Sequence, residues 1–316
     1  MDRFDPRVAT PLFERMTVIG IGLIGSSILH AVRKRGLAKY IVASDHSEDV
    51  CKRAREIGFA DEVTSNVIAA VKNSDLVILC IPVGEYGNIG PQIIPHLRSG
   101  AVLSDVGSVK GCIFTALAPV MRSDIHLIPA HPVAGTEHSG PDAGFATLFV
   151  NRWCILTPQE SADPEAVSKL NSLWQEMGAN TETMSAEHHD LVLAITSHVP
   201  HLIAYNIVGT AADLEEVTRS EVIKFSAGGF RDFTRIAASD PTMWRDVFLN
   251  NKTAVLEMLG RFTEDLTALQ RMIRRGDGDG LFALFTRTRA IRRSIIELGQ
   301  ETAAPDFGRQ RAAEKE

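Results

Sequence analysis

Cysteine is scarce in this 316-residue chain, and no two cysteines form a recognisable motif. The four residues are scattered, with no C-x-x-C pair, at Cys51, Cys80, Cys112 and Cys154. Cys80 lies inside the apolar run LVILCIP, a position typical of a buried small hydrophobic side chain. Isolated cysteines of this kind indicate a reducing compartment.

Long apolar runs and excess positive charge are also missing. No run approaches membrane-spanning length, and residues 1–15 lack the apolar core of a signal peptide. The 33 Lys and Arg against 39 Asp and Glu leave a formal net charge of −6, which gives no reason to expect nucleic acid or an anionic membrane as a partner. We therefore expect a cytoplasmic protein that binds neither.

Residues 16–45 have the pattern of a dinucleotide-binding βαβ unit. An apolar run leads into glycines at the G-x-G-x-x-G spacing, followed by an amphipathic segment, a second apolar run and Asp45. The glycines permit a tight turn, close approach of a pyrophosphate and close helix packing, and the helix N-terminus attracts phosphate. The alternative is a structural turn that binds nothing. The predicted cofactor-binding residues are Gly20, Gly22, Leu23, Ile24, Gly25 and Asp45.

The carboxylate of Asp45 favours NAD⁺ over NADP⁺. It can accept hydrogen bonds from the ribose hydroxyls and would repel a 2′-phosphate. His46 and Arg53, which are basic and close in sequence, would soften that repulsion, so NADP⁺ stays an alternative cofactor.

Apolar runs alternate with helical patterns as far as residue 184 and predict a doubly wound sheet of about eight strands. From residue 185 onward the sequence shows only helical patterns. These cover residues 186–208, 213–224, 241–251, 253–274 and 281–300. The chain is therefore predicted to have an α/β domain at 1–184 and an all-α domain at 185–316. The helices are apolar enough to indicate burial against another subunit.

Two loops follow strands of the first domain, at the edge where α/β sheets bind ligands. His131 is placed to take a proton from an alcohol as hydride leaves the carbon, although a hydrogen-bonded structural histidine is the alternative. Ser108 would orient the same hydroxyl or cap a helix starting at Val109.

In the second half, His198 and His201 lie three residues apart on one helix face, with Pro200 between them. No third ligand accompanies them, so we expect no metal. Arg235 would clamp a carboxylate, or else pair with Asp232 on a helix surface.

With these residues identified, the chain resembles the prephenate/arogenate (cyclohexadienyl) dehydrogenases of tyrosine biosynthesis over residues 16–300. The resemblance rests on the order and separation of VIGIGLIGSS, SDVGSVK, HPVAGTEHSG, HHDLVLAITSHVPH and GGFRDFTRIAASDPTMWRD. It implies a Rossmann-type domain joined to an all-α dimerisation domain, and hence a homodimer. It also implies oxidative decarboxylation of prephenate to 4-hydroxyphenylpyruvate, or of arogenate to tyrosine, with NAD(P)⁺ as oxidant.

The resemblance further implies roles for individual residues. His131 would accept the proton of the ring C4 hydroxyl, Ser108 would assist it by hydrogen bonding, and Arg235 would hold the ring carboxylate. His201 and His198 would belong to the substrate pocket. The positions implied to line or gate that pocket are Thr136, Glu137, Asp232 and Trp244.

Two other functions compete with this one. A dehydrogenase of the β-hydroxyacid type would need a catalytic lysine in the helical domain, where Lys224 and Lys252 are the nearest candidates and neither lies in a convincing motif. A catalytically silent dinucleotide-sensing dimer is the second alternative. The joint presence of His131, Ser108 and Arg235 argues against it. The sequence does not separate prephenate from arogenate as substrate.

Overall fold

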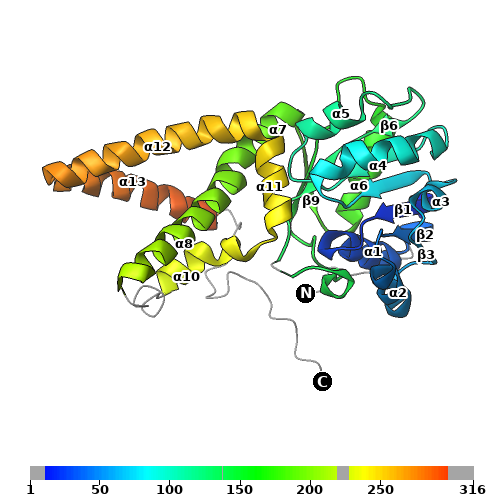
Figure 1. Ribbon diagram of the computed structural model, residues 1–316. Coiled ribbons are helices and arrows are strands. Elements are labelled where there is room, and N and C mark those ends of the chain that lie inside the picture. Colours follow the sequence, from blue (N-terminus) through cyan, green and yellow to red (C-terminus); the bar gives the residue numbers. More distant parts are fainter. Residues whose placement is uncertain (1–10, 137, 219–227, 298–316) are drawn as a thin grey trace. The chain divides into compact units, whose positions relative to one another are not determined.

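The computed structural model describes residues 11–136, 138–218 and 228–297 (Figure 1). The chain divides into two compact units, Met1–Leu256 and Glu257–Glu316, and each is described by itself.

The first unit is built around a six-stranded parallel sheet with the strand order β3-β2-β1-β4-β5-β6. Its strands are β1 Phe13–Ile19, β2 Ala38–Ser44, β3 Glu62–Thr64, β4 Leu76–Leu79, β5 Val102–Asp105 and β6 His126–Leu127. The order reverses between β1 and β4, and open sheets of this kind bind ligands outside the carboxyl ends of the strands at such a point. The predicted doubly wound sheet is thereby confirmed.

Helices cover both faces of this sheet. They are α1 Leu23–Arg35, α2 Glu48–Ile57, α3 Val67–Val71, α4 Tyr86–Ile93, α5 Gly111–Leu117 and α6 Pro164–Glu176, with short 3₁₀ turns η1 Val83–Glu85, η2 Ile94–His96 and η3 Pro141–Ala143. Because side chains alternate along a strand, Val18 and Ile78 face a core shared with α1 and α6, while Ile19 and Leu79 face one shared with α4 and α5. Each fully buried side chain of this size contributes about 1.5–3 kcal/mol to stability.

A separate three-stranded sheet replaces part of the single sheet that we expected. It consists of β7 Ala130–Pro132, β8 Trp153–Leu156 and β9 Asn180–Thr183, with β7 antiparallel to β8 and β8 parallel to β9. The run HLIPAHP changes sheets at Pro129. Ile128 still donates its N–H to Leu103 in the first sheet, whereas the carbonyl of Pro129 accepts from Thr157 in the second. Proline has no N–H with which to continue the first ladder, which explains the break at this residue.

The helical part of the first unit begins with one continuous helix that contains a local irregularity. It comprises α7 Ala186–Leu193, a π turn η4 Ala194–His198 and α8 Val199–Thr218. The separate helix predicted at 213–224 is therefore wrong over its described part, since α8 continues through Gly209 as far as Thr218. It is followed by α10 Gly228–Thr234, the 3₁₀ turn η5 Arg235–Ala238 and α11 Pro241–Asn250.

This continuous helix is apolar on its exposed side. Between Ala186 and Leu214 it is 29 residues long, and its most apolar window has a mean hydropathy of 1.5, with 28% of that window buried. By length and composition alone it could cross a membrane, which the sequence did not lead us to expect. Among the described residues it is the one helix that meets these two criteria. Its buried side carries His189, Asp190 and His198. The exposed large apolar side chains are Leu191, Ile195, Ile207, Val208 and Leu214.

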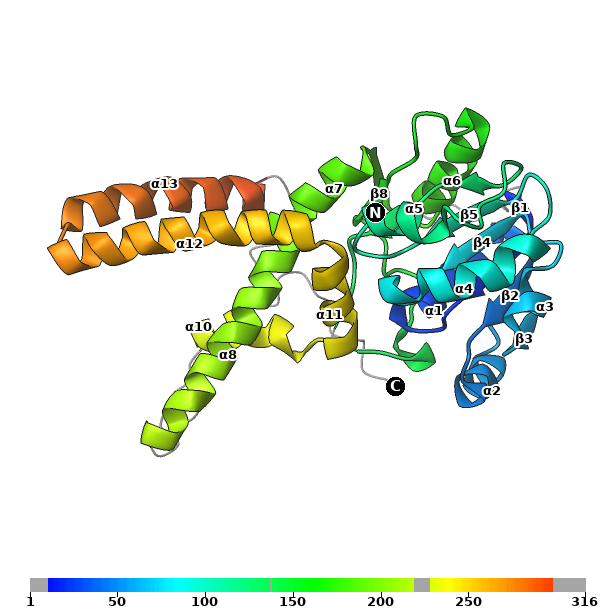
Figure 2. The same cartoon turned by 45° about the horizontal axis from the view of Figure 1, so that its top comes forward.

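The second unit consists of most of α12 Lys252–Arg275 together with α13 Gly278–Glu297. The two helices lie side by side as a hairpin in Figures 1 and 2. Gly276 turns the chain at a φ of 66°, and the carboxylate of Asp277 accepts from the N–H of Gly280. Ile273, Phe282 and Phe285 are exposed, so this hairpin also has apolar surface to cover.

Candidate active site

The turn between β1 and α1 leaves room for a phosphate. Gly20 has a φ of +96°, and a Cβ there would collide with the carbonyl oxygen of Cys80. A Cβ on Gly25 would collide with the carbonyl oxygen of Gly20, whereas one on Gly22 would meet no atom within 4 Å. The backbone therefore packs tightly at two glycines and is open at the third.

The first turn of α1 supplies hydrogen-bond donors at this opening. Gly22 is the N-cap and provides no side-chain cap, and no acidic residue lies in the first turn. The N–H groups of Leu23, Ile24 and Gly25 therefore have no acceptor within the helix, and the positive end of the helix dipole is available to an anion. This arrangement fits the pyrophosphate of a dinucleotide.

Asp45 lies at the carboxyl end of β2 and is held rigidly beside the turn. One carboxylate oxygen accepts from the N–H of Ile21 at 2.9 Å, and the other accepts from the N–H of Ser47 at 3.0 Å. Each oxygen still has a lone pair for a ribose hydroxyl. Of the two basic residues predicted to modify its charge, His46 lies 3.2 Å from the carboxylate. The guanidinium of Arg53 is instead engaged by Asp142 of η3 and by Glu56.

His131 is buried in β7 and begins a chain of three hydrogen-bonded groups. Its Nδ1 lies 2.8 Å from Nε2 of His189, whose Nδ1 lies 2.8 Å from the carboxylate of Asp190. That carboxylate also accepts from the backbone N–H groups of Lys110 and Gly111 at 2.8 and 2.9 Å. The start of α7 is thus tied both to His131 and to the start of α5.

Burial favours the neutral form of both imidazoles in this hydrogen-bonded chain of three groups. Burial lowers the pKa of His131 well below 6.5, and the nearby positive charge of Lys110 acts in the same direction. Burial also lowers the pKa of His189, against the opposing effect of its hydrogen bond to Asp190. A neutral His131 can accept a proton, which is what a general base requires.

A fully buried ion pair lies next to His131. Lys110 forms a salt bridge with Asp105 and also donates to the carbonyl oxygen of Ala130 at 2.7 Å. The same Asp105 carboxylate accepts from the Tyr86 hydroxyl and from the N–H of Gly107. The pair therefore joins the loop that carries Ser108 to the strand that carries His131.

Ser108 is half-buried, and its side chain does not cap a helix. The helix α5 begins at Gly111 rather than Val109. Its N-cap residue is Lys110, whose side chain makes no capping hydrogen bond. Asp190 performs the capping role instead, through its contacts with the first N–H groups. Of the two roles expected for Ser108, capping is therefore wrong.

His198 lies deeper than His201 and has a different environment. Its Nδ1 is 3.1 Å from the amide nitrogen of Asn251, which also donates to the carbonyl oxygen of Asp190. Burial lowers the pKa of His198 to about 4. Its Nε2 is buried and has no hydrogen-bond partner among the described residues.

His201 forms the more accessible part of the site. Its ring stacks on Trp244 of α11, with centroids 3.7 Å apart and planes at 23°. Its Nδ1 donates to the carbonyl oxygen of Ser197 at 2.8 Å. Burial lowers the pKa of His201, and the charge of Arg235 contributes, which places that guanidinium within electrostatic reach.

The π turn determines which residues of the long helix face the site. The N–H of Val199 donates to Ala194, five residues back. In an unbroken α-helix, His189 and His201 would lie roughly 120° apart around the axis. The extra residue of a π turn reduces that angle to about 20°. Pro200, which cannot donate and would clash with a carbonyl four residues back, accounts for the irregularity.

The described members of the remaining predicted positions are exposed. Thr136 is exposed, and its hydroxyl accepts from the N–H of His138. Asp232 is exposed and pairs with Arg231 at 3.4 Å. Lys252 is exposed at the start of α12. Glu137 and Lys224 lie outside the described residues.

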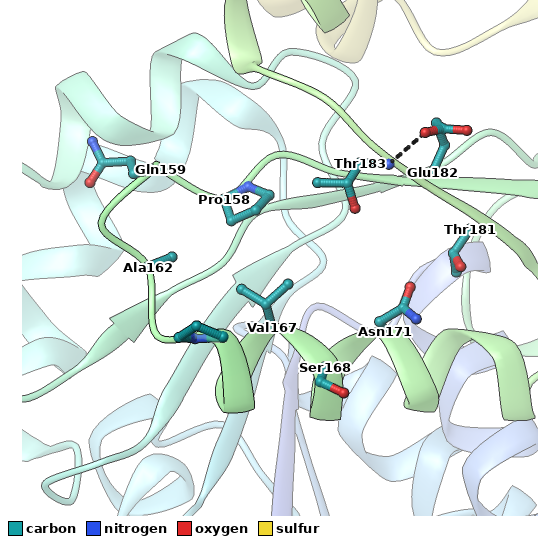
Figure 3. Close-up of a pocket in the computed structure, with 10 residues that line it drawn as sticks. Pro158, Gln159, Ala162, Val167, Ser168, Asn171, Thr181, Glu182 and Thr183 are labelled. Carbon is teal, nitrogen blue, oxygen red and sulfur yellow. Dashed lines mark hydrogen bonds between the residues drawn. The ribbon is translucent and has the colours of Figure 1, made fainter.

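A surface hollow of about 570 Å³ lies elsewhere, between the segment after β8, α6 and β9 (Figure 3). Its polar lining includes Gln159, Ser168, Asn171 and Glu182, and none of the predicted site residues contributes to it. Within the described parts of the chain, no three His, Cys, Asp or Glu side chains are grouped to hold a metal ion.

Comparisons with known proteins identify the family of the chain. Residues 28–183 match the nucleotide-binding domain of prephenate dehydrogenase, and residues 185–287 match its dimerization domain. The cyclohexadienyl dehydrogenase of Zymomonas mobilis is 40% identical, covering 90% of this chain and 97% of the relative. The chain belongs to the prephenate dehydrogenase family.

Solved structures of other family members share the fold. The prephenate dehydrogenase of Aquifex aeolicus, in complex with hydroxyphenyl propionate and NAD⁺, superposes with a TM-score of 0.83 at 31% identity over 89% of this chain and 98% of that one. The Synechocystis arogenate dehydrogenase gives a TM-score of 0.75 at 27% identity over 89% and 99%. The predicted family, fold class and oxidoreductase activity are confirmed, and the relatives support dehydrogenase activity in tyrosine biosynthesis.

The sequence alone did not point to several residues of the candidate site of this prephenate dehydrogenase family member. His189 and Asp190 stand in a quoted motif, HHDLVLAITSHVPH, but received no role. A signal was available, because two polar residues at the start of a very apolar helix need buried partners. No comparable signal distinguished Lys110 or Asn251 from surface residues.

We expect Gly20→Ala to destabilise the fold by about 1–3 kcal/mol from its backbone conformation alone, and the collision with Cys80 adds to this loss. Gly22→Ala is the matched control, because Gly22 has a φ of −82° and open space around it. Urea unfolding of both variants measures the difference. Equal losses of unfolding free energy would contradict the packing described for the turn.

Proposed function

We propose that this chain oxidises and decarboxylates prephenate to 4-hydroxyphenylpyruvate, arogenate to tyrosine, or both, with a nicotinamide dinucleotide as oxidant. The observation that carries the proposal is the buried, neutral His131, hydrogen-bonded to a second histidine. Relatives named cyclohexadienyl, prephenate and arogenate dehydrogenases support the substrate class. The Aquifex aeolicus complex with hydroxyphenyl propionate and NAD⁺ supports the ring and the cofactor.

The reaction removes a hydride from ring C4 and carbon dioxide from ring C1. When bound, the nicotinamide supplies the acceptor for the hydride. His131 takes up the proton of the C4 hydroxyl as the C4–H bond breaks, so that oxygen electrons can form a carbonyl. Loss of carbon dioxide then leaves an electron pair that makes the ring aromatic, and the ring oxygen recovers the proton. The residues of this chain therefore need to orient the ring and provide a base.

Other residues would position the substrate. Ser108, whose hydroxyl is not used for capping, would hydrogen-bond the C4 hydroxyl. Arg235 would hold the ring carboxylate with two charge-assisted hydrogen bonds. His201, backed by Trp244, and the deeper His198 would line the pocket. Thr136, Glu137 and Asp232 stay predictions for the rim of the pocket.

We infer a preference for NAD⁺ over NADP⁺. The carboxylate of Asp45, fixed by two backbone N–H groups, would accept from the ribose 2′-hydroxyl and repel a 2′-phosphate. Engagement of Arg53 by Asp142 and Glu56 supports the preference, because a basic group that would offset this repulsion is already paired.

We also propose a cytoplasmic homodimer in which residues 1–184 form the dinucleotide-binding domain and residues 185–316 the dimerisation domain. The match of residues 185–287 to a dimerization domain supports this, as do the exposed apolar side chains of α8 and of the hairpin. Sedimentation should give twice the 34.5 kDa of one chain, and a single-chain mass at micromolar concentration would refute the dimer.

The activity is tested by following NADH formation at 340 nm with prephenate and then with arogenate. We expect turnover with at least one substrate, and a higher kcat/KM with NAD⁺ than with NADP⁺. No turnover with either substrate would overturn the proposed function. A preference for NADP⁺ would overturn only the role given to Asp45.

His131→Asn should lower kcat by about 10²–10⁴, the usual contribution of a general base. Because the neutral imidazole is the active form and burial lowers its pKa well below 6.5, kcat/KM should fall only as the pH drops well below 6.5. The variant should lose this acidic limb and still bind NAD⁺. His138→Asn, in the exposed loop that follows, is the control. Normal turnover of His131→Asn with the limb intact would place the base elsewhere.

Arg235→Gln should raise the KM for prephenate by roughly 10- to 150-fold, since hydrogen bonds to charged groups contribute about 1.5–3 kcal/mol. Binding of NAD⁺ should not change. The exposed neighbour Arg231, which pairs with Asp232, offers a matched control in Arg231→Gln. An unchanged KM in folded Arg235→Gln would leave Arg235 with a structural role alone.

A further inference from the structure

The hydrogen bonds between Asp190 and His131 have a definite direction. An ionised carboxylate can only accept, and Asp190 receives two backbone N–H groups in addition to His189. His189 must therefore carry its proton on Nδ1. The proton on Nδ1 leaves Nε2 of the neutral ring as an acceptor, so Nδ1 of His131 must donate to it.

The same reasoning determines the state of the other nitrogen of His131. A neutral imidazole carries one proton, and that proton lies on Nδ1. Its Nε2 therefore has a free lone pair. With the opposite tautomer, lone pairs of His131 and His189 would face each other in a buried site, and the hydrogen bond between them would be lost.

We propose that His189 and Asp190 are positioning residues that hold His131 in its Nδ1–H tautomer, so that Nε2 is the atom that accepts the substrate proton. This inference rests on the proposed role of His131 as the base. It adds a function to residues that would otherwise only cap α5 and fill the interface between α7 and β7. A base held in the wrong tautomer loses most of its rate even when its position is preserved.

Several charged or titratable groups surround the hydrogen-bonded groups Asp190, His189 and His131. They contribute to any pH dependence that is measured for His131. Lys110, before α5, faces His131 together with its partner Asp105 of β5. His198 of the π turn also lowers the pKa of His131. Cys154 of β8 contacts the His131 backbone. Substitutions at His189 leave all of these groups in place.

Two variants of His189 separate tautomer control from packing. His189→Phe keeps a ring of similar size but offers no acceptor to His131, whereas His189→Gln offers an amide oxygen. We expect His189→Phe to lower kcat about 10²-fold, with KM for prephenate and NAD⁺ binding unchanged, and His189→Gln to recover most of that loss. His188→Phe, on the exposed neighbour, is the matched control. Equal losses in the Phe and Gln variants, or no loss in either, would overturn the inference.

The tautomer can also be read directly, from ¹⁵N ring shifts of the histidine-labelled wild-type protein at pH 7. His131, assigned by its absence from His131→Asn spectra, should show a protonated Nδ1 and an unprotonated Nε2. A protonated Nε2 would overturn the inference even if His131→Asn is inactive. A protonated Nδ1 together with full activity of His131→Asn would instead refute the role of His131 as the base, and absence of turnover in the wild-type protein would refute the proposed function itself.

Discussion

The buried charge of Asp105 is the constraint on which the candidate site depends. A charge in a protein interior is tolerated only when it is paired and fully hydrogen-bonded, and removing one partner of such a pair costs about 3–5 kcal/mol. Asp105 meets this requirement with Lys110, Tyr86 and the backbone at Gly107. These groups come from α4 and from the loop after β5, and Lys110 reaches on to Ala130 in β7. Satisfying one carboxylate thus brings the loop of Ser108 against the strand of His131.

A second carboxylate extends this arrangement into the helical part of the first unit. Asp190 accepts the N–H groups that begin α5 and orients His189 against His131. Asn251 then joins the Asp190 carbonyl to His198. Each buried polar group uses its neighbour to satisfy its own hydrogen-bonding capacity. Burial within this network lowers the pKa of both His131 and His189, and for His189 it does so against the opposing effect of Asp190.

The helix that carries these histidines shows how a local irregularity serves the site. Pro200 prevents regular α-helical hydrogen bonding. The π turn before it rotates the rest of the helix about its axis by the angle of one residue. His201 is thereby turned toward the face that bears His189, where Trp244 stacks on it. The opposite side of the same helix is apolar and exposed among the described residues.

Local patterns were sufficient to predict much of the fold. The glycine spacing with Asp45 located the first βαβ unit, because the tight turn and close packing require glycine at Gly20 and Gly25. Serine is a favoured N-cap residue, and the side chain of Ser47 accepts from the N–H of Val50 at the start of α2. Failures occurred where distant parts of the chain decide the outcome. The single large sheet became two at Pro129, and the helix predicted to end at residue 208 continues as α8 to Thr218.

The sequence by itself determined the order of elements, the dinucleotide turn and the candidates His131, Ser108 and Arg235, because glycine spacing, hydrophobic periodicity and loop position are local properties. Only the tertiary structure decided which polar groups meet. The pairs His131–His189 and Lys110–Ala130 join residues 58 and 20 positions apart. The lowered pKa of His131 arises from burial and from charges on other elements. Such contacts depend on how sheet and helices pack, since burial and hydrogen-bond partners exist only once distant segments have been brought together.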